Sequence, residues 1–190
     1  MTTDSRDLLT LPANLPIPQD DGRASHLVGT AVPSVLLPAT DGTLVDLSTI
    51  PGRTVVFGYP LTGRPDQPSL VPDWDQIPGA RGCTPQTCGF RDLAHEFEAR
   101  GYRVFGLSTQ PSAYQQEMVS RLHVPFPVLS DATLALTTAL RLPTLTVADQ
   151  TLLARIAWVQ HDARIVQVWY PVFPPDRNAA TVLAWVQQQA

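Results

Sequence analysis

Two cysteines are the residues of this 190-residue chain whose type and spacing most clearly indicate chemistry. Cys83 and Cys88 are its only cysteines, and they stand five positions apart. In a reducing cytosol, a pair this close in sequence is more often metal-binding or redox-active than structural. A zinc site would need two further ligands, and the four histidines show no ligand spacing (His26, His95, His123 and His161). The pair therefore indicates thiol redox chemistry, and we expect neither a metal nor a cofactor.

The residues that follow Cys83 predict an amphipathic helix that begins beside its sulfur. Thr84 is a good N-cap, and Pro85 suits the first helical position. Apolar residues then recur with helical spacing until Gly101 (Phe90, Leu93, Ala94 and Phe97). A cysteine reacts as its thiolate, and the unpaired N–H groups and positive dipole at a helix N-terminus stabilise an anion. Cys83 is therefore the expected nucleophile.

The five-residue spacing also limits how the two sulfurs can meet. In one regular helix, residues five apart have Cα atoms roughly 8 to 9 Å from each other. A disulfide requires a Cα separation below about 7 Å. Either Cys83 lies outside the helix, or the first turns must unwind before Cys83 and Cys88 can bond.

Turn signals and apolar runs predict the elements on either side of this helix. Asp41-Gly42 is a type I′ turn signal between two apolar stretches, so residues 35–47 are expected to form a β-hairpin. The unbroken apolar run at residues 54–59 predicts a strand that is buried on both faces. A capping box of Ser112 and Gln115 predicts a helix that runs to about Leu122.

The complete order of elements indicates the fold class. The other expected elements are a strand at 103–108, a helix at 131–140, a hairpin of 155–160 with 165–170, and a last helix with one apolar face (Ala179, Val182, Leu183 and Val186). A parallel βαβ unit followed by a ββα unit is the order of a thioredoxin-like α/β fold. We therefore expect a central mixed β-sheet flanked by helices, with an N-terminal β-hairpin extension.

The length of the chain fits one domain with additions. Residues 1–25 contain three prolines and no periodic pattern, which predicts an extended N-terminal arm. Residues 26–190 are expected to form the domain. A long stretch rich in proline and glycine precedes Cys83, and a loop of that length is usually functional or disordered.

Charge and hydropathy narrow the possible partners and location. The net charge is −4, and the 13 basic residues are arginines scattered singly, so no basic stripe could hold a phosphate backbone. Asp4 and Asp7 stand where a signal peptide would need positive charge, and no apolar run approaches the ~18 residues of a membrane span. We expect a cytoplasmic protein that binds neither nucleic acid nor a membrane.

The residues around the cysteines also carry a family resemblance. Residues 82–92 read GCTPQTCGFRD and follow a buried strand that ends in Tyr59-Pro60. This arrangement resembles the active-site helix of peroxiredoxins of the bacterioferritin comigratory, or Q, subfamily, and the resemblance covers about residues 28–190. In that family the first cysteine is peroxidatic and the second is resolving. The resemblance therefore implies these roles for Cys83 and Cys88.

The chain departs from the family upstream of the helix. The usual Pro-x-x-x-Thr-x-x-Cys pattern is replaced by Gln76 and Ala80 at its proline and threonine positions. We infer that residues 63–79 are a looped-out insert and that Pro60 and Thr62 fold back to the family's usual place.

The family also uses an arginine from a later strand to polarise the peroxide. Arg155, at the start of the strand Ile156 to Gln160, matches that position, and Arg141 is the second candidate.

The resemblance implies a thiol peroxidase of the atypical 2-Cys type. It would reduce hydrogen peroxide or alkyl hydroperoxides, be recycled by thioredoxin or a similar dithiol, and act as a monomer without a cofactor. Two other functions remain open. A thioredoxin-like disulfide oxidoreductase would share the fold but normally carries C-x-x-C, and a non-catalytic interaction module would keep the core and lose the thiolate.

Overall fold

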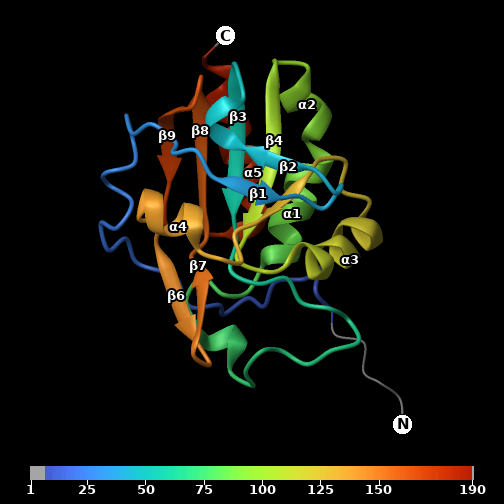
Figure 1. Cartoon of the computed structure of the whole chain (residues 1–190). Helices are drawn as coiled ribbons and strands as arrows, with labels where there is room; N and C mark the ends of the chain where they lie inside the picture. The colour runs from blue at the N-terminus through green and yellow to red at the C-terminus, as the bar shows by residue number, and fades with distance from the viewer. Residues whose placement is uncertain (1–6, 190) are drawn as a thin grey trace.

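Strand β3 (Arg53–Gly58) forms the centre of the fold in the computed structural model, which describes residues 7–189. It runs parallel to β4 (Tyr102–Ser108) and antiparallel to β8 (Ile156–His161). Strands β5 (Val128–Ser130) and β9 (Arg164–Trp169) complete a mixed sheet of order β5-β4-β3-β8-β9 (Figure 1). The expected strands are present, but the three-residue β5 was missed because so short a run has no readable period.

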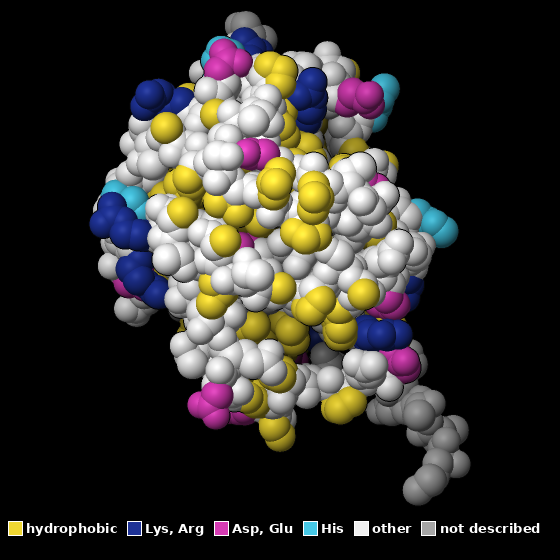
Figure 2. All heavy atoms as spheres, viewed as in Figure 1, with side chains coloured by type: hydrophobic (Ala, Val, Ile, Leu, Met, Phe, Trp, Pro, Cys, Tyr) yellow, Lys and Arg dark blue, Asp and Glu magenta, His cyan; other side chains and the backbone are white. Residues whose placement is uncertain are grey.

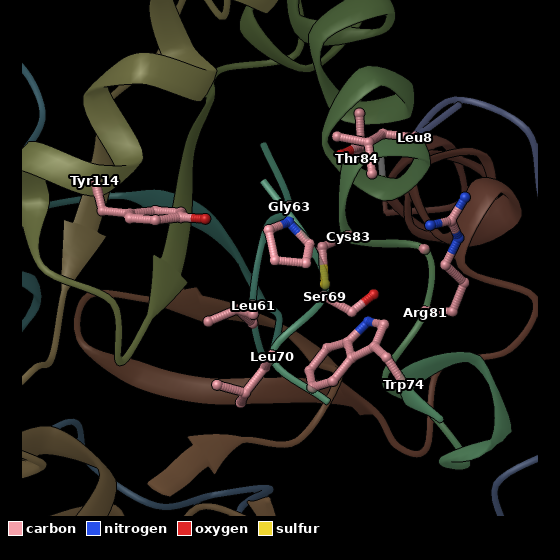
Figure 3. A pocket seen from close by; sticks show the side chains of 12 residues that line it. Leu8, Leu61, Gly63, Ser69, Leu70, Trp74, Arg81, Cys83, Thr84 and Tyr114 are labelled. Carbon is pink, nitrogen blue, oxygen red and sulfur yellow. The ribbon is translucent and has the colours of Figure 1, made fainter. Parts of the chain in front are cut away.

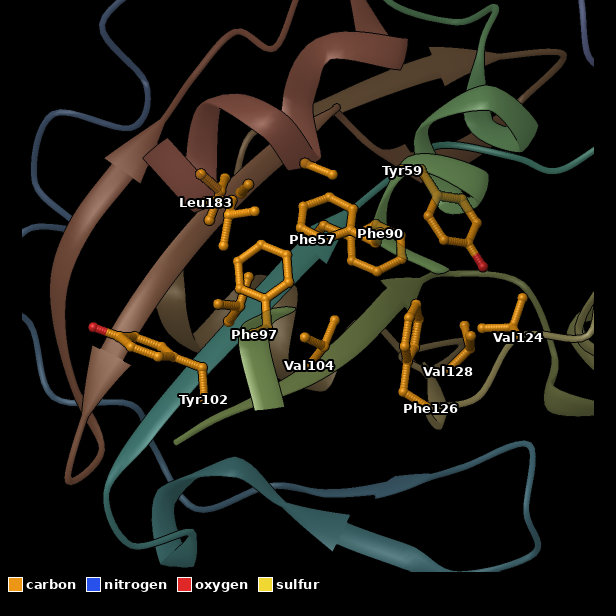
Figure 4. Close-up of a cluster of buried hydrophobic side chains, with 14 of the residues drawn as sticks. Phe57, Tyr59, Phe90, Phe97, Tyr102, Val104, Val124, Phe126, Val128 and Leu183 are labelled. Atoms are coloured by element: carbon orange, nitrogen blue, oxygen red, sulfur yellow. The ribbon is translucent and has the colours of Figure 1, made fainter. Parts of the chain in front are cut away.

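Four helices contribute to the core on one face of the sheet: α1 (Cys83–Asp92), α2 (Ala94–Glu98), α3 (Ser112–Leu122) and α5 (Asn178–Gln187). Val55 and Phe57 of β3 point into this layer, because alternate strand residues face the same side. The Phe57 ring stacks on Phe90 of α1 with centroids 4.2 Å apart (Figure 4). This packing fixes α1 against the central strand.

The opposite face of the sheet is covered by the N-terminal hairpin and by α4 (Ala135–Leu140). The hairpin pairs β1 (Leu36–Pro38) with β2 (Leu44–Asp46) and leads into the short 3-10 helix η1 (Leu47–Thr49). The expected hairpin is confirmed, but its type I′ turn is wrong. Of residues 39–43 only Gly42 has a positive φ, whereas type I′ requires two such residues.

The single helix expected from Thr84 to Gly101 is wrong, since two helices share its apolar stripe. α1 ends at Asp92, and Leu93 leaves the helical region with φ −103° and ψ 6°. The N–H of Glu96 then bonds to the Leu93 carbonyl at 3.0 Å, which is a tighter 3-10 contact. Tertiary packing of both segments on the sheet therefore bends a stripe that is continuous in sequence.

Two predicted helix starts also differ from the structure. The capping box of Ser112 and Gln115 does not form, because Pro111 is the N-cap of α3 and the Gln115 side chain is buried. The helix expected from Asp131 begins at Ala135 instead. The buried Asp131 carboxylate accepts the N–H groups of Leu136 and Thr137 at 3.0 and 2.7 Å, so this residue supports the helix from outside it.

The long loop before α1 packs on a hairpin that the sequence did not predict. Strands β6 (Thr144–Val147) and β7 (Gln150–Leu153) form this hairpin, and η2 (Trp74–Gln76) is a 3-10 helix within the loop. Trp74 is 4% exposed and belongs to a small apolar cluster with Val147 and Leu152. The loop thus has its own core, as long loops in compact domains often do.

The N-terminal arm is extended where the structure describes it. Residues 7–25 contain neither helix nor strand, and residues 1–6 of the expected arm lie outside the described residues. The arm passes Gly82, which lies close to both Leu11 of the arm and Pro175 of the C-terminal 3-10 helix η3 (Pro175–Arg177). The division into an arm and a domain stays a prediction. Within residues 7–189, no helix is long and apolar enough to cross a membrane.

Candidate active site

Cys83 is the first residue of α1, with its side chain in the open first turn of the helix. The N-cap is Gly82 and not the expected Thr84, which is the second helical residue. Gly82 has a φ of 106°, and a Cβ at this position would overlap Cγ of Pro175, so only glycine fits here. Pro85 falls in the first turn, where its missing N–H leaves no helical bond unmade.

Arg155, the arginine that the family resemblance points to, lies against the sulfur. It directly precedes β8, and its Nη2 is 3.3 Å from Sγ of Cys83. The same nitrogen donates to the carbonyl oxygens of Ala80 and Arg81, both at 3.0 Å. One guanidinium therefore holds both the loop that enters α1 and the cysteine that begins it. Arg141 is exposed at the C-terminal end of α4 and is not the arginine of this site.

The positive charge of Arg155 is buried without a counter-ion. The side chain is only 2% exposed, and no ion pair joins it to a carboxylate in the part of the chain that the structure describes. An unpaired buried charge is costly, and carbonyl dipoles offset it only in part. A thiolate on Cys83 would supply the missing negative charge.

A buried chain of amides holds the guanidinium from its other side. Nη1 of Arg155 donates to Oε1 of Gln86, and Nε2 of Gln86 donates to Oδ1 of Asn178 at 2.9 Å. Gln86 is fully buried one turn beyond Cys83, and Asn178 is the first residue of α5. The loop before α1, α1 itself and, through Gln86, α5 therefore position the arginine.

Tyr59 and Gln115 form a second buried polar pair next to the sulfur. The Tyr59 hydroxyl donates to Oε1 of Gln115 at 2.6 Å, and Tyr59 shares the core cluster of Cys83. Burial, together with the negative charge of a Cys83 thiolate, raises the pKa of Tyr59 well above its usual range. Tyr59 is therefore a neutral phenol that orders this part of the core.

A small cavity of about 30 Å³ opens at Cys83 (Figure 3). Its walls come from four regions of the chain: the arm, the long loop, the first turn of α1 and α3 (Leu8, Leu61, Ser69, Leu70, Trp74, Arg81, Thr84 and Tyr114 among others). The sulfur lies between the loop residues and the helix in this view. A reactant that enters the cavity meets the thiol directly.

Pro60 and Thr62 lie beside the site, but the Thr62 hydroxyl bonds elsewhere. The Thr62 hydroxyl is buried and donates to Oε1 of Gln110 at 3.0 Å, while its neighbours Leu61 and Gly63 line the cavity. Pro60 is buried, and its carbonyl accepts from Ser108 at 3.2 Å. The fold-back of Pro60 and Thr62 to the family's usual place stays a prediction, and the Thr62 hydroxyl bonds to Gln110 and not to Cys83.

Cys88 occupies the same helix in different surroundings. It is half-buried against the edge of the core and forms no disulfide with Cys83. Burial raises the pKa of the Cys88 thiol, while the charges of Arg91 and Arg121 oppose this effect. Because both cysteines belong to α1, oxidation to a disulfide requires the start of the helix to unwind.

The structure offers no cluster for a metal within residues 7–189. Groups of three or more His, Cys, Asp or Glu side chains that could hold an ion are absent from this part of the chain. The candidate site therefore rests on the thiol, the guanidinium and the cavity between them.

Comparison with known proteins now places this geometry in a family. The family model described as Redoxin matches residues 27–183. This chain belongs to the redoxin family.

Relatives and solved structures agree with this assignment. The redoxin is 34% identical over 106 residues to peroxiredoxin bcp1 of Schizosaccharomyces pombe, an alignment that covers 55% of this chain and 46% of the relative. It is 33% identical over 126 residues to a chloroplastic putative peroxiredoxin Q of Oryza sativa subsp. indica, covering 63% and 51%. The chain thus spans about half the length of these curated relatives.

Solved structures share the fold over most of the chain. The peroxidoxin BcpB of Mycobacterium tuberculosis superposes with a TM-score of 0.68 at 26% identity, covering 86% of this redoxin and 97% of that chain. Peroxiredoxin Q of Xanthomonas campestris superposes with a TM-score of 0.62 at 20% identity, covering 92% and 97%. The thioredoxin-like fold and the resemblance to the bacterioferritin comigratory, or Q, peroxiredoxins are both confirmed.

Sequence reasoning missed the residues that position Arg155 in this redoxin. Gln86 stands three positions after Cys83, so it shares one helical face with the sulfur, and that spacing could have identified it. Asn178 gives no such signal, because only the packing of α5 on α1 brings it to Gln86. The same is true of Leu8, which reaches the cavity from the arm.

Proposed function

We propose that this redoxin is a thiol peroxidase in which Cys83 reduces a peroxide and Cys88 resolves the product. The observation that carries the proposal is the Arg155 guanidinium 3.3 Å from Sγ of Cys83, at the open end of α1 and on a small cavity. A buried cation beside a thiol favours the nucleophilic thiolate and also stabilises charge on a departing oxygen. Membership of the redoxin family supports the same chemistry.

In the first step the Cys83 thiolate attacks the terminal oxygen of the peroxide. The S–O bond forms as the O–O bond breaks, and the departing oxygen takes a proton to leave as water or an alcohol. Cys83 is oxidised by two electrons to a sulfenic acid while the peroxide is reduced. Arg155 stabilises the charge that develops on the leaving oxygen. Thr84 is the threonine that lines the cavity, so we assign a hydroxyl contact with the peroxide to it and not to Thr62.

In the second step the Cys88 thiolate attacks the sulfenic sulfur of Cys83. The disulfide forms, and the hydroxyl leaves as water after taking a proton. Two thiols of an external thioredoxin-like dithiol then reduce the disulfide and become oxidised themselves. We further propose that the protein acts as a monomer in the cytoplasm on hydrogen peroxide or an alkyl hydroperoxide, without a cofactor.

Thiol titration before and after one equivalent of hydrogen peroxide tests this function. A peroxidase should lose both thiols rapidly with hydrogen peroxide alone, without a second protein. A disulfide oxidoreductase would lose them only on mixing with an oxidised protein disulfide, and a non-catalytic module would lose neither at a rate above that of free cysteine. Either of these last results would refute the proposal.

A further inference from the structure

The cavity at Cys83 is small enough to select among peroxides. Its volume of about 30 Å³ compares with the 10 to 15 Å³ that one water needs on this scale, so it holds about two oxygen atoms. Hydrogen peroxide consists of two oxygens and fits. An aromatic or branched hydroperoxide carries a carbon group larger than this space, so that group must extend past the side chains that line the cavity.

Leu8 of the N-terminal arm supplies one of these walls. It is 7% exposed and lies beside Thr84, at the start of α1, on the rim of the cavity (Figure 3). Leu8 is buried without being a member of the three core clusters, and it lines the cavity. Its neighbour Leu9 is 61% exposed and does not line the cavity.

Arg81 fastens this part of the arm to the loop that enters the active site. Its Nη2 donates to the carbonyl oxygens of Asp7 at 2.5 Å and Thr10 at 3.2 Å. The Asp7 carboxylate accepts the N–H groups of Leu9 and Thr10, which forms a local turn around Leu8. The backbone carbonyl of Arg81 in turn accepts from Arg155. Leu8 is therefore held in place by residues tied to the catalytic arginine.

A larger hollow adjoins the cavity, and the two share lining residues. This groove of about 540 Å³ lies between the long loop, α3 and the β6–β7 hairpin, and Figure 2 shows hydrophobic side chains around it. Cys83 does not line the groove. Leu61, Pro68, Leu70 and Tyr114 line both spaces, so only the smaller cavity is bounded by the sulfur itself.

We infer that Leu8 is a specificity-determining residue that restricts the reduced enzyme to peroxides of the size of hydrogen peroxide. The inference rests on the proposed peroxidase function. Seated over the first turn of α1, the leucine excludes the carbon group of an organic hydroperoxide from the space in front of Cys83. Shortening this one side chain should open the site on the side of the arm.

Rates of Cys83 oxidation by hydrogen peroxide and by cumene hydroperoxide test the inference on the full chain. Leu8→Ala should raise kcat/KM for cumene hydroperoxide by about tenfold or more relative to that for hydrogen peroxide, since a few methylenes in an apolar wall discriminate to this extent. Arg81→Gln should shift the ratio in the same direction, because it releases the arm while Leu8 is retained. Leu9→Ala is the matched control and should leave the ratio of the wild-type enzyme unchanged.

An unchanged ratio in Leu8→Ala would overturn the inference and would mean that bulky peroxides reach the sulfur by another path. Alkylation of Cys83 in a Cys88→Ser background separates this failure from failure of the proposed function. There, Leu8→Ala should speed the reaction with N-phenylmaleimide more than that with iodoacetamide, whether or not the protein reduces peroxides. Equal acceleration of both reagents would also contradict a role in size selection.

Discussion

The first and second turns of α1 place the same side chain in two different environments. Cys83 faces a buried guanidinium and a cavity, whereas Cys88 is half-buried at the edge of the apolar core, with its pKa raised. The two thiols are five residues apart in one helix, and local sequence separates them only by placing Cys83 at the helix start. The tertiary structure adds the guanidinium and the cavity at the first turn and the apolar edge of the core at the second.

Replacing the nucleophile should have the largest effect. Cys83→Ser is expected to abolish peroxide turnover, because a serine hydroxyl supplies no competent nucleophile at neutral pH. A coupled assay with a thioredoxin-like reductant measures the loss. If this variant still turned over peroxide, the roles of Cys83 and Cys88 would have to be exchanged.

Replacing the second thiol should stop cycling but spare the first reaction. In Cys88→Ser we expect Cys83 to react once, at close to the wild-type rate, and then to accumulate as sulfenic or overoxidised acid. Mass spectrometry of the oxidised variant reports this product. A recyclable internal disulfide is impossible here, so sustained turnover with thioredoxin would show that resolution does not need Cys88.

Removing the charge beside Cys83 should slow the first step without stopping it. Arg155→Met is expected to reduce the rate of Cys83 oxidation by about 10² or more, the usual cost of losing one preorganised donor. Rapid mixing with hydrogen peroxide measures this rate. Arg141→Met is the matched control, since Arg141 is exposed at the end of α4. A slow Arg141→Met beside a normal Arg155→Met would reverse the assignment.

Oxidation should speed amide hydrogen exchange in α1 and leave exchange in the central strand β3 unchanged. A Cys83–Cys88 disulfide requires the first turns of α1 to unwind, so amide exchange across residues 80–95 should speed up by about tenfold or more. Val55 to Phe57 of β3 should stay protected, because they lie between β4 and β8 in the buried sheet. Equal exchange in the two redox states, with the disulfide confirmed, would show that the bond forms without unwinding.

The smallest expected effect concerns the titration of Cys88. Its raised pKa means that less thiolate is present at neutral pH than in an exposed cysteine, so Cys88 should alkylate slowly at pH 7 and faster as the pH rises. Iodoacetamide labelling of the Cys83→Ser variant between pH 7 and 10 measures the midpoint, which should exceed about 8.5. A midpoint below that value would mean that Arg91 and Arg121 outweigh burial.

Much of the fold and part of the site were readable from the sequence, because the signals for them are local. An unbroken apolar run predicted the central strand β3, helical apolar spacing predicted α5, and the residues that follow Cys83 predicted a helix that begins beside it. Arg155 was identified through the family resemblance, which places an arginine at the start of a later strand. The position of a residue within a helix or strand can be predicted without knowing which other elements pack against that helix or strand.

Only the tertiary structure decided which side chains complete the site. Arg155 bonds to Gln86, and Gln86 to Asn178, because the residues around β8, α1 and α5 pack together. The Thr62 hydroxyl bonds to Gln110, a residue 48 positions away in the chain, and not to Cys83. The sequence determined that Cys83 begins a helix and that a strand follows Arg155. Their partners are contacts between residues far apart in the chain, and such contacts depend on the packing of several elements at once, which no single stretch of sequence encodes.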